Sequence, residues 1–242
     1  KIGYQLNELC NKNGLGSLIL GAATPDIRSM TKWPRDRTHF SPLTIDYVGK
    51  GIATMFKKHP SLSDEKNINK TTKAFLSGYI SHLVADDLWI LEIYRPYFDN
   101  ASTVNQQIRA NVFDRAIQLD MDRHAQKALD IPGEINALLK GASEGVKISF
   151  IDQNDLDKWT KWLDEFTKSE TTWDRLRFAT ARMYRNTANF HQAMLEAETF
   201  LNRLPNSLEE IYSLVPKSKI TNFRKNVSAH SLNFIKRYLY VS

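Results

Sequence analysis

The chain has 242 residues, is 42 % hydrophobic and carries a formal net charge of +6, so it can form one sizeable core. It has no apolar run of about 18 residues, which excludes a membrane-spanning helix, and no signal-type leader is visible. Because the chain begins at Lys1 rather than Met, secretion is not excluded. The single cysteine, Cys10, excludes an intrachain disulfide and weakly favours the cytosol.

Helical periodicity dominates the sequence and strand signals are sparse, so we predict an all-α fold. The pattern predicts helices over residues 2–12, 43–58, 71–94, 104–130, 156–166 and 172–204. Residues 25–41 are predicted to be a loop, and residues 147–151 could form one short strand. We see no linker long enough to separate two domains.

The net positive charge is concentrated in the C-terminal residues 216–242, which contain no acid. The basic residues there are Lys217, Lys219, Arg224, Lys225, Lys236 and Arg237. This segment could bind an anionic membrane surface or the phosphates of a nucleic acid. Alternatively, it is a helix that packs its apolar face and exposes a solvated basic face, and such charge runs are usually solvated. The second interpretation is favoured.

One face of the helix predicted over residues 71–94 combines aromatic side chains with a histidine and an aspartate. The residues that recur at steps of three and four are Phe75, Tyr79, His82, Asp86, Trp89 and Ile93. His82 and Asp86 are one turn apart, about 5–6 Å between Cβ atoms. A buried carboxylate costs several kcal/mol unless it is paired or bound to a metal. The pair is therefore either a structural hydrogen bond or part of a metal site.

Two further residues upstream favour the metal site. Asp26 follows Pro25, and His39 lies thirteen residues later. Two imidazoles and two carboxylates can complete a tetrahedral zinc site, or parts of two sites that share a ligand.

Three short motifs carry a resemblance to a known family. They are G-x-x-x-P-D over residues 21–26, H-F over 39–40, and G-Y-x-x-H-x-x-x-D over 78–86. In this pattern the first half of the chain resembles the zinc-dependent phospholipase C family. The resemblance implies an all-α bundle around one to three zinc ions and hydrolysis of a phosphate ester by metal-activated water. It implies Asp26, His39, His82 and Asp86 as metal ligands, with Asp86 bridging and Asp26 also orienting the water.

The sequence departs from that family in two respects. No histidine precedes His39, although a histidine of the N-terminal helix belongs to the family's cluster. Glu92 stands where the family has a later histidine, and Asp114 is the best carboxylate downstream. A third site built from Glu92 and Asp114 would be rich in oxygen and would suit a harder ion than zinc, or none.

These observations predict a zinc-dependent phosphodiester hydrolase of phospholipase C type. Its substrate would be a phosphate ester, with a phospholipid as one possibility and nucleic acid not favoured; the oligomeric state stays open. A zinc-dependent nuclease is an alternative, because S1/P1-type nucleases share the metal architecture. A non-enzymatic helical binding module with a degenerate metal site is another. The metal-bearing half would be residues 1–140, and residues 141–242 would form a helical half without ligands.

Two further features bear on that prediction. Arg28, Arg35 and Arg37 crowd the segment between the first ligands, where they could clamp a phosphate through forked hydrogen bonds or simply be solvated. The chain lacks an adjacent His-Asp pair, an H-E-x-x-H motif, and P-loop and dinucleotide fingerprints, which argues against the corresponding enzyme classes.

Overall fold

The computed structural model describes residues 12–64, 68–129 and 132–240. Helices dominate these residues and no strand occurs among them, so the predicted all-α fold is confirmed. No helix in these ranges is both long enough and apolar enough to cross a membrane. The helix predicted over residues 2–12 and the position of Cys10 lie outside the described residues.

The chain divides into two compact units, and each unit combines separate stretches of sequence. The first contains the described residues up to Trp89, Pro132–Ser169, and those from Arg224 onward. The second contains the described residues of 90–131 together with Glu170–Phe223. The predicted halves, residues 1–140 and 141–242, were divided at one point in the sequence, whereas each compact unit combines several stretches. That the whole chain forms one domain stays a prediction.

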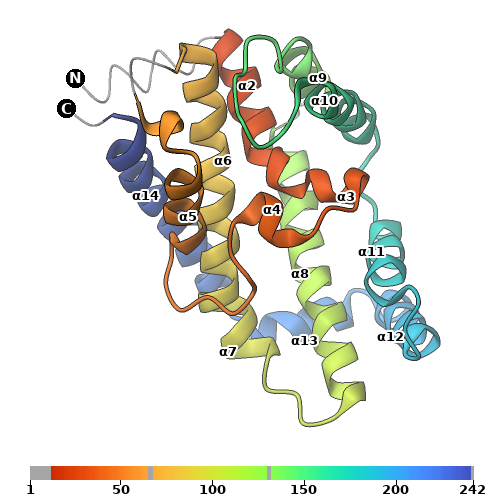
Figure 1. The fold of residues 1–242 in the computed structure, drawn as a ribbon. Helices are drawn as coiled ribbons and strands as arrows, with labels where there is room; N and C mark the ends of the chain where they lie inside the picture. The colour runs from red at the N-terminus through yellow and green to blue at the C-terminus, as the bar shows by residue number, and fades with distance from the viewer. Residues whose placement is uncertain (1–11, 65–67, 130–131, 241–242) are drawn as a thin grey trace. The chain divides into compact units, whose positions relative to one another are not determined.

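The first unit carries the predicted metal ligands of the N-terminal motifs. Its elements are α2 (Lys12–Ala23), η1 (Thr24–Ile27), α3 (Arg28–Thr31), α4 (Arg35–His39), α5 (Lys50–Lys58), η2 (Pro60–Ser63), α6 (Lys70–Leu88), α9 (Pro132–Leu139) and α10 (Gln153–Lys168) (Figure 1). The segment predicted as a loop over residues 25–41 thus contains three short helical turns. Residues 43–49 are not helical, because Gly49 adopts a left-handed φ of 94° and α5 begins only after it.

The second unit is built around the long helix α8. Its elements are η3, a π-helical turn (Trp89–Tyr94, with Trp89 at the boundary), α7 (Arg95–Phe98), α8 (Val104–Leu129), α11 (Asp174–Tyr184), α12 (Phe190–Asn202) and α13 (Asn206–Leu214). Helices α11, α12 and α13 all contact α8. The rings of Phe113 and Phe200 meet edge to face with centroids 5.9 Å apart, and Asn111 Nδ2 donates a hydrogen bond of 2.9 Å to Tyr184 Oη.

Two predictions of local structure were wrong. The helix expected over residues 172–204 is interrupted at residues 185–189, where Asn186 takes a left-handed φ of 66°. Residues 147–151, for which a short strand was considered, contain no strand, and residues 149–151 form bends. The backbone N–H of Lys147 donates to Thr72 Oγ1 at 2.9 Å, so a side chain satisfies it instead of a neighbouring strand.

The last helix, α14 (Lys217–Leu239), begins in the second unit and ends in the first. In the first unit, Ile235 and Leu239 are buried and the ring of Tyr238 stacks on Phe56 at 4.5 Å. The side chains of Lys236 and Arg237 are exposed. This arrangement agrees with a helix that packs an apolar face and leaves a basic face in solvent, and binding to an anionic partner stays untested.

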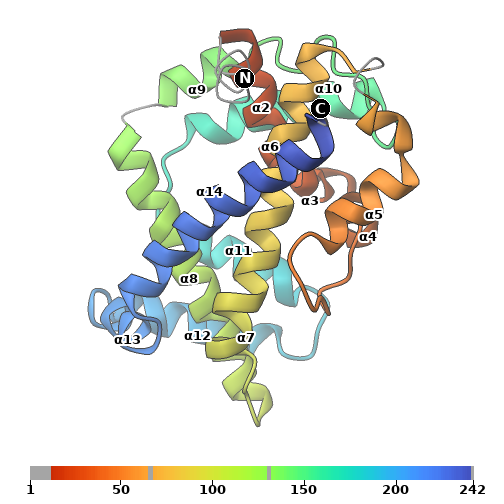
Figure 2. The same cartoon turned by 90° about the vertical axis from the view of Figure 1, so that its left-hand side faces the viewer.

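Helices α2 and α6 lie side by side and form the centre of the first unit (Figures 1 and 2). Their backbones touch at two glycines. A Cβ atom on Gly78 would lie 1.9 Å from the carbonyl oxygen of Leu18, and one on Gly21 would lie 1.9 Å from that of Phe75. Only residues without a side chain permit this approach, and it places the segment around His82 against the end of α2.

We expect Gly78→Ala to destabilise the protein by about 1–3 kcal/mol or more, because the new methyl group must push two backbones apart. Chemical denaturation followed by circular dichroism measures the change in the free energy of unfolding. The control is Ser81→Ala on the same helix, whose hydroxyl bonds only to the carbonyl of Gly78 and whose loss should change stability by no more than about 0.5 kcal/mol. Equal stabilities of the two variants would contradict the close helix contact.

Candidate metal centre

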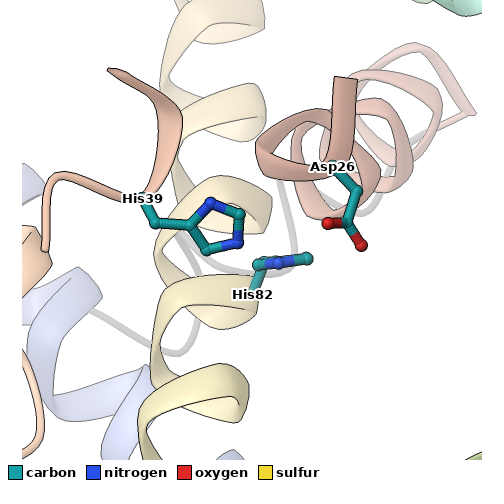
Figure 3. Close-up of side chains that lie close together, drawn as sticks. All are labelled: Asp26, His39 and His82. Carbon is teal, nitrogen blue, oxygen red and sulfur yellow. The ribbon is translucent and has the colours of Figure 1, made fainter. Parts of the chain in front are cut away.

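Three of the predicted ligands come together in the first unit. Asp26, His39 and His82 each offer a ligand atom, and these atoms all lie within 4.8 Å of one another. The side chains extend from three separate elements, η1, α4 and α6, toward a common space (Figure 3). The imidazole rings of His39 and His82 have centroids 5.4 Å apart and an interplanar angle of 69°. We call these three residues the trio.

The position of Asp26 follows from the short 3₁₀ turn that continues α2. Thr24, Pro25 and Ile27 are buried in this turn, while Asp26 is exposed. Pro25 suits the first turn of a helix because its fixed φ is helical and its missing N–H would have no partner there. Three anchored side chains therefore hold the turn, and the fourth, the Asp26 carboxylate, is left accessible to an ion and to water.

His39 is the buried member of the trio, with 2 % of its surface exposed. Its position is fixed from both sides, because Tyr79 donates a hydrogen bond to the carbonyl of Thr38 and Phe40 packs edge to face on Phe150 at 5.2 Å. Burial lowers the pKa of His39 to about 2, with smaller contributions from the charges of Arg35, His82 and Arg28. The ring is therefore neutral at physiological pH, the form that binds metals.

A hydrogen bond identifies the nitrogen that His39 offers to an ion. Its Nδ1 lies 3.1 Å from Thr38 Oγ1. The hydroxyl of Thr38 donates to the carbonyl of Arg35 at 3.4 Å, so it accepts from Nδ1–H. This arrangement leaves Nε2 of His39 with the lone pair.

A backbone carbonyl orients His82 in the same way. Nδ1 of His82 lies 2.7 Å from the carbonyl oxygen of Ala22. A carbonyl only accepts, so Nδ1 carries a proton, and Nε2 is the nitrogen that can face an ion. Ala22 belongs to the last turn of α2, where carbonyls lack partners within the helix. Metal-bound histidines commonly donate their second N–H to such an acceptor, which fixes the ring orientation.

The donor set of the trio fits a divalent transition metal. One carboxylate and two neutral imidazoles are a common catalytic zinc ligand set, which leaves a fourth position for water or substrate. Ligand atoms around a tetrahedral zinc ion lie roughly 3.3–3.5 Å apart, given bonds of about 2.0–2.1 Å. The limit of 4.8 Å on the separations within the trio is wider than that spacing, so binding an ion would have to draw the side chains together. The chemistry of the set supports a metal ion, and it does not identify zinc.

Asp86, the fourth predicted ligand, lies outside the trio. It forms an ion pair with Arg35, whose Nη2 donates to Asp86 Oδ2. Sequence analysis assigned Arg35 either to phosphate binding or to solvent and missed this pair. No local signal could reveal it, because 51 positions separate the two residues. The bridging role of Asp86 stays a prediction.

The two carboxylates predicted for a third metal site belong to the second unit. Glu92 is half-buried on the π-helical turn η3. Asp114 is buried on α8, where it accepts a hydrogen bond of 2.9 Å from Gln118 Nε2. Their use as metal ligands stays a prediction.

The other two arginines between Asp26 and His39, Arg28 and Arg37, have different surroundings from Arg35. The guanidinium of Arg37 stacks over the ring of Trp33, 3.4 Å from its centroid. Arg28 is exposed, and its charge contributes to the lowered pKa of His39. Two cations, Arg28 and Arg35, therefore act electrostatically on the trio.

Asp87, the neighbour of Asp86 on α6, is not part of the trio and has a structural partner. Its Oδ2 accepts the backbone N–H of Gly49 at 2.8 Å, which ties the start of α5 to α6. Burial raises the pKa of Asp87 to about 6, and the bond from Gly49 opposes this rise. Asp87 is thus a structural acceptor that is costly to ionise.

Comparisons of the chain with protein-family models, curated proteins and solved structures find no match. The similarity to phospholipase C therefore rests on the three short motifs. The geometry of the trio is the independent observation on which a function can be proposed.

We expect His82→Gln to weaken zinc binding by at least about 100-fold, because it removes one of three protein ligands. Isothermal titration calorimetry of the full chain with zinc measures this loss. The control is His59→Gln, a histidine of the same unit that contacts Ser149 at 2.8 Å outside the trio. If both variants bind zinc as the wild type does, the trio is not a metal centre.

The raised pKa of Asp87 predicts a pH-dependent stability. The folded protein binds a proton there between pH 4 and 6 more readily than the unfolded chain does, so Asp87 makes the protein less stable as pH rises through about 6. We expect the stability of wild type relative to Asp87→Asn to fall by up to about 3 kcal/mol from pH 4 to pH 7, at 1.36 kcal/mol per pKa unit. Denaturation curves of both proteins across this range test it, and parallel pH profiles would contradict it.

Proposed function

We propose that this protein is a metal-dependent phosphoric-ester hydrolase in which water attacks phosphorus. The observation that supports the proposal most strongly is the convergence of Asp26, His39 and His82 within 4.8 Å. The motif resemblance to zinc-dependent phospholipase C, in which these positions are ligands, points to the same chemistry. Zinc is the proposed ion.

Each residue of the trio has a distinct part in this proposal. His39 and His82 would provide nitrogen ligands, and their rings are held by Thr38 and Ala22. Asp26 would provide one oxygen ligand, and its carboxylate, on an exposed residue, would also orient the attacking water and accept its proton. A divalent ion held there would lower the pKa of a bound water to about 7 and neutralise charge on the phosphoryl oxygens.

The charges around the trio favour an anionic substrate. Arg28 and Arg35 act electrostatically on the trio, and a guanidinium presents a fork of N–H donors that matches phosphate oxygens. A neutral ester or peptide would gain little from these cations. This reasoning supports a phosphate ester and does not choose between a phospholipid, a nucleotide and a small metabolite.

One observation favours a second candidate, a non-enzymatic helical module with a degenerate metal site. Asp86, the carboxylate expected to bridge two ions, is paired with Arg35 instead, so the expected metal cluster would be incomplete. Such a site could stabilise the fold of the first unit without turnover. Zinc binding without hydrolysis of any phosphate ester would support this candidate.

The test is zinc-dependent hydrolysis of bis(4-nitrophenyl) phosphate by the full chain. We expect turnover that a chelator abolishes and zinc restores. Asp26→Asn should lower kcat/KM by at least about 100-fold, because it removes a ligand and the proton acceptor. Asp36→Asn is the matched control, since Asp36 is an exposed acid on α4 outside the trio and its loss should leave the rate unchanged.

A substrate panel then separates the ester classes. Phosphatidylcholine vesicles, single-stranded DNA and 4-nitrophenyl phosphate represent a phospholipid, a nucleic acid and a monoester. Turnover that persists in a chelator, or that is equal in Asp26→Asn and the wild type, would contradict the proposed function.

A further inference from the structure

An ion pair lies one helical turn from two members of the trio. Arg35 precedes His39 by four residues on α4, and Asp86 follows His82 by four residues on α6. Arg35 Nη2 donates to Asp86 Oδ2, and the two side chains are 17 % and 26 % exposed. The pair therefore connects the same two elements that carry the two histidines, and it is largely shielded from water.

The guanidinium of Arg35 has N–H groups that its ion pair with Asp86 does not use. One nitrogen bonds to Asp86, while Nε is buried and has no hydrogen-bond partner among the described residues. A buried donor without an acceptor is unfavourable, and a phosphate oxygen is an acceptor that a guanidinium suits well. The charge of Arg35 also contributes to the lowered pKa of His39, so the group acts on the trio.

A centre with two metal ions needs an anionic ligand next to the first ion for the second one to share. The Asp86 carboxylate is the residue at that place on α6, and a guanidinium already neutralises it. Arginine keeps its charge at any physiological pH, so it cannot leave the pair by losing a proton.

We propose that the centre binds a single divalent ion on Asp26, His39 and His82, and that Arg35 takes the place of a second ion. Asp86 then acts as the anchor of Arg35 rather than as a metal ligand. Arg35 presents its remaining N–H groups to the substrate. The statement that one ion binds rests on the trio and on the pair of Arg35 with Asp86. The statement that Arg35 binds substrate rests on the proposed function.

This arrangement gives a specific charge balance. Asp86 cancels the charge of Arg35, and Asp26 cancels only half the charge of a divalent ion. With Arg28 close enough to act on His39, the loaded centre stays net positive. It therefore favours an anionic phosphate ester with one ion bound.

The test counts zinc ions per chain by elemental analysis of the full chain after zinc incubation and dialysis. We expect one ion in the wild type and two in Arg35→Met, in which Asp86 is free to bind an ion. Arg37→Met is the matched control, because Arg37 stacks on Trp33; it should keep one ion. Two or more ions in the wild type, or one ion in Arg35→Met, would overturn the proposal.

A second variant covers the case in which Arg35→Met does not fold by circular dichroism. Asp86→Asn should still bind one ion, and its loss of zinc affinity should be at least tenfold smaller than that of Asp26→Asn. An equal loss in the two variants would identify Asp86 as a ligand and overturn the proposal. One bound ion without hydrolysis refutes the proposed function alone, whereas no bound ion refutes both.

Discussion

The contact between α2 and α6 is the constraint on which the candidate site depends. Two glycines allow the backbones to touch, since a Cβ on either Gly21 or Gly78 would collide with a carbonyl oxygen of the other helix. Ala22 directly follows Gly21, and His82 comes one turn after Gly78. Because the crossing is tight, the carbonyl of Ala22 reaches the ring of His82 and fixes its orientation. The same end of α2 continues into the turn that presents Asp26.

The residues of the trio have unequal access to water, and this inequality suits a catalytic ion. His39 is buried and Asp26 is exposed. Burial keeps His39 neutral, so no proton competes with an ion for its nitrogen at physiological pH. An open carboxylate on the other side leaves room for water and substrate. A purely structural zinc site is usually closed by four protein ligands, and the trio supplies three.

Much of the fold and of the candidate site could be predicted from the sequence, and the predictions of local structure that were wrong share a cause. The all-α fold and the approach of three ligands follow from helical periodicity and from short motifs, which are local features. The strand considered possible over residues 147–151 does not form, and the backbone N–H of Lys147 donates to Thr72 instead. The helix expected over residues 43–58 begins only at Lys50, after Gly49, which packs against Phe234 with a left-handed φ. Both depend on residues distant in sequence, which periodicity does not detect.

In the candidate site, too, the features that are local in sequence could be predicted, and the contacts between distant residues could not. Spacing places His82 and Asp86 on one helix face, and both lie there. Spacing does not say which cation Asp86 meets, and in the structure it meets Arg35, 51 positions away. Spacing also does not reveal that the guanidinium of Arg37 stacks over the ring of Trp33, and its role in phosphate binding stays a prediction. A motif of ligands therefore predicts where the candidate ligands lie, but it does not predict the charges around them, on which the proposed number of ions depends.

A guanidinium in place of a second ion changes what the centre requires from its surroundings. A second metal ion is bound only when its free concentration is sufficient, and it is lost to a chelator. Arg35 is covalently part of the chain and keeps its charge throughout. It is also held by Asp86 before substrate arrives, so part of the ordering needed to bind phosphate is complete in advance. A guanidinium would polarise the phosphate less strongly than a second metal ion, because it carries one positive charge and the ion carries two. A centre of this kind would depend on a single ion, and its affinity for phosphate would persist in part when that ion is absent.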